Sequence, residues 1–201
     1  MKNNTFGKLL FAAVLSAVLT ASICAAGEAQ LYQLDKAHSR IGFSVGHMGI
    51  STVSGQFKDY DGEIRFKAGE DGSLSAKATI QVASVDTGIE ARDKHLLNED
   101  FFDAEQHPTI TYDAKAVSND GEQWLLKGTF TMRGTKRELE LPLTVKGPIE
   151  DPWGNSRIGL QGRAVINRHD YGVGSDKLSD KMVGREVTLE IALEAIAVQD
   201  E

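Results

Sequence analysis

The chain has 201 residues, a formal net charge of −7 and a single cysteine. This acidic balance argues against a nucleic-acid partner, because the chain would repel a phosphate backbone. One cysteine cannot form an internal disulfide, so stability must come from a hydrophobic core, for which this length suffices as one domain.

The first 26 residues have the pattern of a secretory signal peptide. Two lysines precede an apolar run over residues 9–21, which is too short to span a bilayer comfortably. Small residues at Cys24 and Ala26 predict cleavage near Ala26. The alternative, a lipid attached to Cys24, is disfavoured because Ile23 stands where a small residue is required.

Cleavage would leave a domain over residues 27–201 in the periplasm or outside the cell. Its net charge would be −9, because the segment removed holds two lysines and no acidic residue. The rest of the chain has no apolar run long enough for a membrane helix, so we do not expect an integral membrane protein.

Apolar and polar residues alternate in eight later segments, as in strands that bury one face. Lys58 and Asp59 mark a change of parity that predicts a β-bulge. Turn residues, such as those of 70–72 and 119–121, separate neighbouring segments. Short turns favour sequential antiparallel pairing, in a closed barrel or a sandwich. The segments cover residues 40–47, 53–66, 74–82, 110–116, 124–132, 139–145, 158–166 and 187–193.

We predict an all-β fold, an eight-stranded antiparallel up-and-down barrel, with a short helical insertion between strands 3 and 4. The alternation stops between Asp86 and Pro108, where Thr87 and Glu90 have the spacing of a capping box. Leu97 and Phe101 are four residues apart and would share a face of the helix, which could cover one end of the barrel. A second irregular stretch, residues 167–184, is predicted to be a long loop of the kind that often carries function.

The inward positions favour a cavity. They carry no charged residue, so an occupant should be uncharged and apolar. Many are small, which would leave space inside a barrel of this size. Alternatively, the small residues only allow strands to bend or pack closely. They are Gly55, Gly62, Ala76, Ala78, Ala114, Gly128, Gly162 and Ala164.

The sequence gives little support for catalysis or metal binding. The five histidines lack the spacing of a ligand cluster, and no Gly-x-Ser-x-Gly elbow is present. We therefore predict no catalytic residue and no metal. Arg92, Asp93 and His95 crowd one turn of the expected helix, either to meet a ligand head group or to fasten the helix to the rim through Arg168 or Asp170.

Several motifs lie along the chain, including Asp35-x-x-His38-Ser39, Arg92-Asp93-x-His95-Leu96, Phe101-Phe102-Asp103 and Asn167-Arg168-x-Asp170-Tyr171-Gly172. Together they resemble the YceI-like family over about residues 31–196. The resemblance implies a lipocalin-like barrel that encloses a polyisoprenoid or an isoprenoid quinone tail, a periplasmic or secreted location, and association with a cytochrome b561-type membrane protein. Tyr112 and Tyr171 stand where the family commonly has Phe, and each hydroxyl needs a partner, so we expect both near a wet end of the tunnel.

The resulting prediction is a non-enzymatic lipid carrier, monomeric or homodimeric, with no cofactor other than the bound lipid. The alternatives are an enzyme or haem-type or metal site at the barrel mouth, and a filled barrel acting as a stress or interaction protein. Candidates for the polar mouth are His38, Arg92, Asp93, His95 and Arg168. The predicted tunnel residues are Ile41, Phe43, Val45, Phe57, Ala78, Ile80, Leu96, Leu97, Phe101, Phe102, Tyr112, Leu126, Gly128, Leu141, Leu160 and Leu189.

Overall fold

The computed structural model describes residues 28–69, 73–174 and 179–199. The predicted signal peptide over 1–26, with its cleavage site at Ala26, lies outside these residues, as does the predicted turn over 70–72. Among the described residues, no helix combines the length and the apolar character needed to cross a bilayer.

Strands dominate the fold, with one short α-helix and three short 3-10 turns. The helix α1 covers Glu90–Leu96, and the 3-10 turns are η1 (Lys36–His38), η2 (Val82–Ser84) and η3 (Arg168–Tyr171). The strands are β1 (Gln30–Leu34), β2 (Arg40–His47), β3 (Ser51–Phe57), β4 (Tyr60–Lys67), β5 (Ser73–Gln81), β6 (Val85–Asp86), β7 (Thr109–Asp120), β8 (Gln123–Met132), β9 (Thr135–Glu150), β10 (Ser156–Asn167) and β11 (Val183–Ala197).

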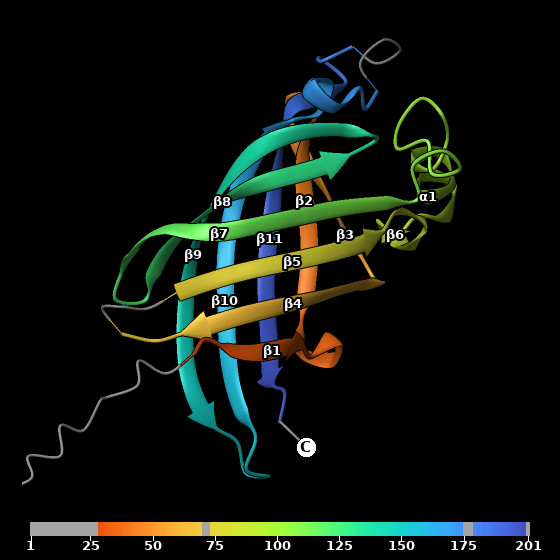
Figure 1. Cartoon of the computed structure of the whole chain (residues 1–201). Helices are drawn as coiled ribbons and strands as arrows, with labels where there is room; N and C mark the ends of the chain where they lie inside the picture. Colours follow the sequence, from red (N-terminus) through yellow and green to blue (C-terminus); the bar gives the residue numbers. More distant parts are fainter. Residues whose placement is uncertain (1–27, 70–72, 175–178, 200–201) are drawn as a thin grey trace, which may run out of the picture.

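These strands form one closed antiparallel barrel (Figure 1). The ladder runs in the order β1-β4-β5-β7-β8-β9-β10-β11-β2-β3-β6, and β1 also pairs with β11. β1 and β2 both pair with β11, so together they form one bent strand of the barrel. β4 pairs with β1 and β3 pairs with β2, so β3 and β4 form the next bent strand. The same holds for β5 and β6, which pair with β4 and β3. The prediction of an eight-stranded barrel with a helix between strands 3 and 4 is therefore confirmed.

Two local expectations at the start of the barrel were wrong. The sequence pattern missed β1, in which Tyr32 alone is fully buried, so little alternation shows. The parity change at Lys58 and Asp59 is not a bulge but the corner between β3 and β4, where these two residues pair in neither ladder. At this corner the Lys58 amide donates to the carbonyl of Ser84 at 3.1 Å, which redirects the chain from one ladder to the next.

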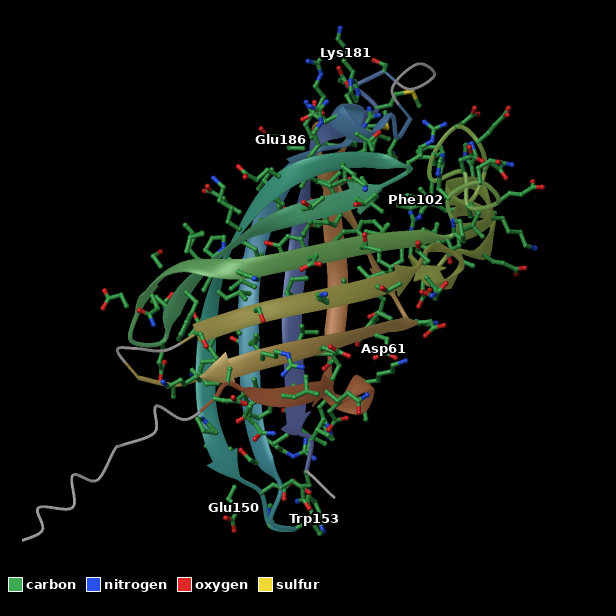
Figure 2. All side chains as sticks on the ribbon, viewed as in Figure 1. Asp61, Phe102, Glu150, Trp153, Lys181 and Glu186 are labelled. Carbon is green, nitrogen blue, oxygen red and sulfur yellow. The ribbon has the colours of Figure 1, made fainter. Side chains whose placement is uncertain are left out.

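The buried side chains fall into two clusters along the barrel. One cluster lies around Trp124, whose ring meets Phe66 edge-on with centroids 5.6 Å apart. The other gathers at the end covered by α1, where Phe102 meets Phe57 edge-on at 5.9 Å. Figure 2 shows Phe102 at this covered end and Trp153 at the far end, on the β9–β10 hairpin. The interior is thus packed at one end and closed by an insertion at the other.

The inward glycines do not create internal space, contrary to the expectation from their size. A Cβ on Gly55 would lie 2.4 Å from the Phe43 ring, and one on Gly128 would lie 2.1 Å from the carbonyl oxygen of Asp113. Gly62 and Gly162 are similarly crowded by neighbouring strands. These positions are glycine because strands or side chains approach closely there, which was the alternative that the sequence left open.

We predict that Trp124→Ala lowers the free energy of unfolding by about 3–5 kcal/mol, because it leaves a void against Phe66 in the packed cluster. Urea denaturation followed by far-ultraviolet circular dichroism measures this. Trp153→Ala is the matched control, since that side chain is exposed and its loss should change stability by less than about 0.5 kcal/mol. Equal effects of the two substitutions would contradict the assignment of the packed end.

Candidate ligand-binding cavity

A cavity of about 180 Å³ lies inside the barrel between the packed cluster and the covered end. One water molecule needs only about 10–15 Å³, and an apolar cavity of about 150 Å³ can hold a benzene molecule, so the space is large enough for a small apolar group. Its wall is aliphatic and aromatic almost throughout. Lining side chains come from strands on every side of the barrel, from α1 and from the segment after η3, and include Leu34, Phe43, Ala78, Leu96, Phe130, Leu141, Val173 and Leu193.

All the predicted tunnel residues except Leu97 and Gly128 line this cavity. Leu97 packs against the covered-end cluster from outside the cavity, and Gly128 lies against the backbone of β7. Most lining residues that the prediction omitted, such as Ile64 and Met132, belong to the same alternating stripes. Leu34, Val173 and Val183 could not be found this way, because they lie in or beside segments without clear alternation.

Tyr112 does not sit at a wet end as expected. Its hydroxyl donates to the carbonyl of Leu139 at 3.1 Å, within the barrel wall. Burial, with a smaller effect from the charge of Glu140, raises the pKa of Tyr112 to about 12. The ring therefore lines the cavity while the hydroxyl is satisfied by the backbone. Tyr171 is also buried, with its ring edge-on to Phe130 at 5.5 Å.

The helix α1 is anchored by side chains that were candidates for the polar mouth. Arg92 donates from Nε to the hydroxyl of Thr87 at 2.7 Å and from Nη2 to the carbonyl of Thr87 at 2.8 Å. Asp93 accepts from the amide of Thr87 at 2.9 Å and from its hydroxyl. Neither side chain lines the cavity. Both side chains therefore fasten the helix to Thr87, in the segment just before it, and not to the barrel rim through Arg168 or Asp170 as expected.

The expected capping box at Thr87 and Glu90 is not formed. The helix begins after Ile89, and the Thr87 hydroxyl is used by Asp93 and Arg92 instead. Glu90 pairs with Lys94 one turn later, at 2.6 Å. The helix also ends at Leu96, so Leu97 and Phe101 do not share a helical face. Local bonds from Thr87 to Arg92 and Asp93 have thus replaced the expected capping box.

Two segments cover the same end of the barrel and are joined to each other. Arg133 donates to the carbonyl of Glu99 at 2.6 Å and to that of Gly172, while the amide of Gly174 donates to the carbonyl of Asp100 at 2.8 Å. His95 stacks edge-on against Phe101 at 4.9 Å, which places it on the outer side of this cover. The segment after α1 and the segment after η3 therefore form one cover.

Arg168 is the one polar-mouth candidate that lines the cavity, and it is only 3% exposed. Its Nε donates to the carbonyl of Gly184, and its Nη1 donates to two carbonyls, of Val173 and Gly174. Its Nη2 donates to Asp180 and to the carbonyl of Val183. A guanidinium has five N–H donors, and here all five have protein acceptors. Arg168 therefore holds the cover in shape and leaves no donor for a ligand.

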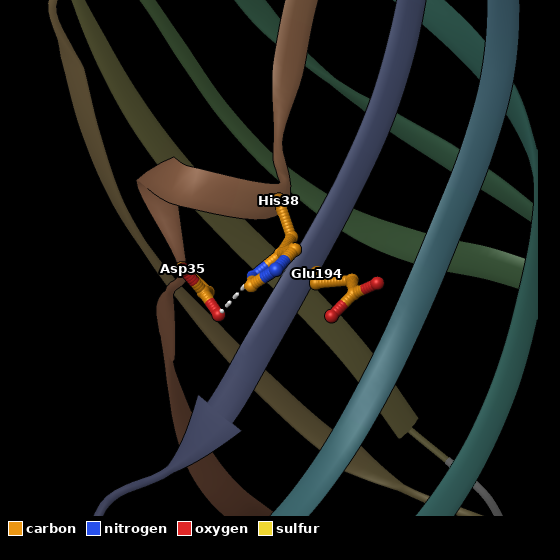
Figure 3. A group of neighbouring side chains, drawn as sticks. All are labelled: Asp35, His38 and Glu194. Atoms are coloured by element: carbon orange, nitrogen blue, oxygen red, sulfur yellow. Dashed lines mark hydrogen bonds and ion pairs between the residues drawn. The ribbon is translucent and has the colours of Figure 1, made fainter.

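His38 lies away from the cavity, in the small group of Figure 3 with Asp35 and Glu194. Its Nδ1 lies 2.9 Å from Asp35, and ligand atoms of all three residues lie within 4.8 Å of one another. However, Arg157 already bridges Asp35 at 2.7 Å and Glu194 at 3.3 Å. A cation would compete with this guanidinium, so the group is best described as an ion-pair network that ties β1, β10 and β11 together.

The same neighbourhood does not form a nucleophilic triad. Ser39 donates its hydroxyl to the carbonyl of Glu194 at 3.2 Å and accepts from the amide of that residue at 3.0 Å. Its hydroxyl is thus occupied by the strand β11. The types of residue in the Asp35-x-x-His38-Ser39 motif fit a hydrolase, but their arrangement serves the barrel wall.

Comparison with known proteins decides the family. The family model described as the YceI-like domain matches residues 32–195. The chain belongs to the YceI-like family. A UPF0312 protein of Pectobacterium carotovorum is 33% identical over 187 residues, which cover 91% of this chain and 96% of that protein.

Solved structures of YceI-like proteins share this barrel. The YceI protein of Campylobacter jejuni aligns with a TM-score of 0.69 at 33% identity, covering 84% of this chain and 98% of that one. A polyisoprenoid binding domain from Saccharophagus degradans aligns with a TM-score of 0.66 over 86% of this chain and 100% of that one. At 20% identity, the second likeness shows the shared fold alone.

The Arg157 network gives this YceI-like barrel a specific acid sensitivity. Hydrogen bonds from Arg157 and then His38 lower the pKa of Asp35 from 3.8 to about 2. A carboxylate with a lowered pKa stabilises the fold fully above its ordinary pKa, and this contribution is lost as the pH falls. Asp35→Asn should therefore be less stable than wild type at neutral pH, and the difference should vanish between about pH 4 and pH 2. Urea unfolding at several pH values measures the difference in free energy of unfolding between wild type and Asp35→Asn. A difference that does not change with pH would contradict this role of the network.

Proposed function

We propose that this protein encloses a long, uncharged apolar chain, a polyisoprenoid or an isoprenoid quinone tail, in the barrel cavity. The observation that carries the proposal is an interior space bounded by aliphatic and aromatic side chains. Burial contributes about 0.8 kcal/mol for each CH₂ group, so every carbon of the chain that enters the cavity adds to the driving force.

The polar groups at the wall favour an apolar occupant over a charged one. Arg168 uses its donors on four backbone carbonyls and the Asp180 carboxylate, and Tyr112 uses its hydroxyl on a backbone carbonyl. Lys77 borders the cavity, but its ammonium lies 3.7 Å from Asp113 on the outer face, where the side chain is largely exposed. A buried charged ligand would find no ready partner here, and leaving it unpaired would be costly.

The family adds the rest of the proposal. A solved neighbour with the same fold is described as a polyisoprenoid binding domain, which is consistent with the ligand class that the cavity favours. We further propose a periplasmic or secreted location after cleavage near Ala26, a monomeric or homodimeric state, and delivery to or from a cytochrome b561-type membrane protein. In this role the protein carries lipid and catalyses no reaction.

The alternatives receive less support from the site. A haem-type or metal site in the barrel would need an inward histidine, and none of the histidines in the described part of the chain lines the cavity. A filled barrel acting only as a stress or interaction protein would have a packed interior, whereas this one holds open space. An absorption spectrum and a metal assay on native protein would detect the first alternative.

Organic extraction of natively purified protein, followed by mass spectrometry, tests the proposal directly. We expect an isoprenoid lipid in the extract, in an amount comparable to that of the protein, because the cavity should not stay empty in the presence of such lipids. Absence of any apolar ligand, together with failure of added polyprenols to bind, would overturn the proposal.

Filling the cavity tests where the ligand lies. Ala78 lines the cavity, so Ala78→Trp should lower lipid occupancy about tenfold or more while the β-sheet spectrum stays the same. Thr79→Trp is the matched control, because Thr79 is the next residue of β5 and its exposed side chain points to the other face. Equal lipid content in the two variants would show that the ligand binds elsewhere.

A further inference from the structure

Three large apolar side chains are exposed together at one end of the barrel. Met48 and Ile50 lie in the turn between β2 and β3, and Met182 immediately precedes β11; they are 56%, 85% and 51% exposed. The amide of Met48 donates to the carbonyl of Met182 at 2.9 Å, so the two segments are joined. We refer to Met48, Ile50 and Met182 as the mouth patch.

The mouth patch adjoins strands that line the cavity. His47 pairs with Val183 in the β2–β11 ladder, and Val183 lines the cavity together with Val45. Each of these inward valines lies one to three residues from a member of the patch. The two strands that adjoin the patch thus also carry cavity-lining valines, with only Gly46 and His47 between Val45 and Met48.

The barrel wall is also least complete beside the patch. β3 pairs with β2 along its whole length, but its other edge pairs with β6 only at Gln56 and Phe57. Within the described part of the chain, residues 51–55 thus have ladder partners on one side only. A chain-like ligand that entered here would pass the patch, and no continuous ladder would have to open.

Charge distinguishes this end from the rest of the protein. Residues 41–58 contain no aspartate or glutamate, although the chain as a whole has 29 of them and a net charge of −7. Lys181 and Glu186 both extend from the same end of the barrel (Figure 2). Asp180, the acid nearest Met182 in the chain, is paired with Arg168 and Arg185. An anionic surface would therefore meet less repulsion at the mouth patch than at a typical part of this acidic protein.

We propose that the mouth patch docks onto a phospholipid bilayer that contains anionic lipid, so that the apolar ligand passes between membrane and cavity without crossing water. This inference rests on the proposed function. A second copy of the chain is a weaker fit, because stable dimers bury about 800 Å² on each partner and three side chains supply much less. Peripheral membrane binding, in contrast, needs only a few inserted apolar side chains supported by electrostatics.

Flotation of the purified protein with vesicles of phosphatidylethanolamine and phosphatidylglycerol tests the docking. Wild type should float with the vesicles, and Ile50→Asp or Met182→Asp should reduce the bound fraction by about tenfold, because each places a charge in an apolar contact. Ile149→Asp is the matched control, since Ile149 is 65% exposed on the far β9–β10 hairpin and should float as wild type does. Circular dichroism of each variant verifies that the barrel is folded.

The possible results separate docking from ligand binding. The docking proposal would be overturned if wild type did not float with the vesicles. It would also be overturned if Ile149→Asp reduced the bound fraction as much as Ile50→Asp does. Light scattering that showed a dimer dissociated by Ile50→Asp, without vesicle binding, would assign the patch to self-association and overturn it as well. Flotation that depends on the patch, in a protein from which no apolar lipid is ever extracted, would support docking while removing the carrier function.

Discussion

Closure of the barrel through β11 is the constraint on which the rest of the structure depends. This one strand pairs with β10 along its length, with β2 over its first part and with β1 at its end. An open sheet would expose unpaired backbone groups at its edges and would enclose nothing. Closure instead produces an interior, and the Arg157 network reinforces it where β1, β10 and β11 meet.

The polar groups of this protein serve mainly to keep the cavity apolar. Arg168 is buried at the cavity wall, yet its five donors are all used on the segment after η3 and on the first residues of β11. Arg133 joins that segment to the one after α1, and Arg92 fastens α1 itself. These three arginines bond to protein acceptors in the segments that form the cover. They therefore hold the cover together and do not offer their own charge to a ligand.

Much of the cavity could be predicted because its wall is made of regular strands. Phe43, Leu126 and Leu160 follow from alternation alone, since every second side chain of a barrel strand points inward. The small size of an inward residue did not predict where open space remains in the barrel. Gly55 and Gly128 accommodate close approach by Phe43 and by β7, whereas Ala78 does border the cavity. A sequence pattern gives the direction of a side chain but not the distance to its neighbour across the core.

The sequence by itself determined the strand order, the barrel, the position of the helix and the apolar character of the interior, because these depend on local periodicity and turn chemistry. Only the tertiary structure decided what the polar residues do. Thr87 bonds to Asp93 and Arg92 instead of capping α1 with Glu90, and His38 lies with Asp35 outside the cavity. The physical reason is that a hydrogen-bond partner is chosen by three-dimensional proximity, which sequence spacing fixes only within a single regular element.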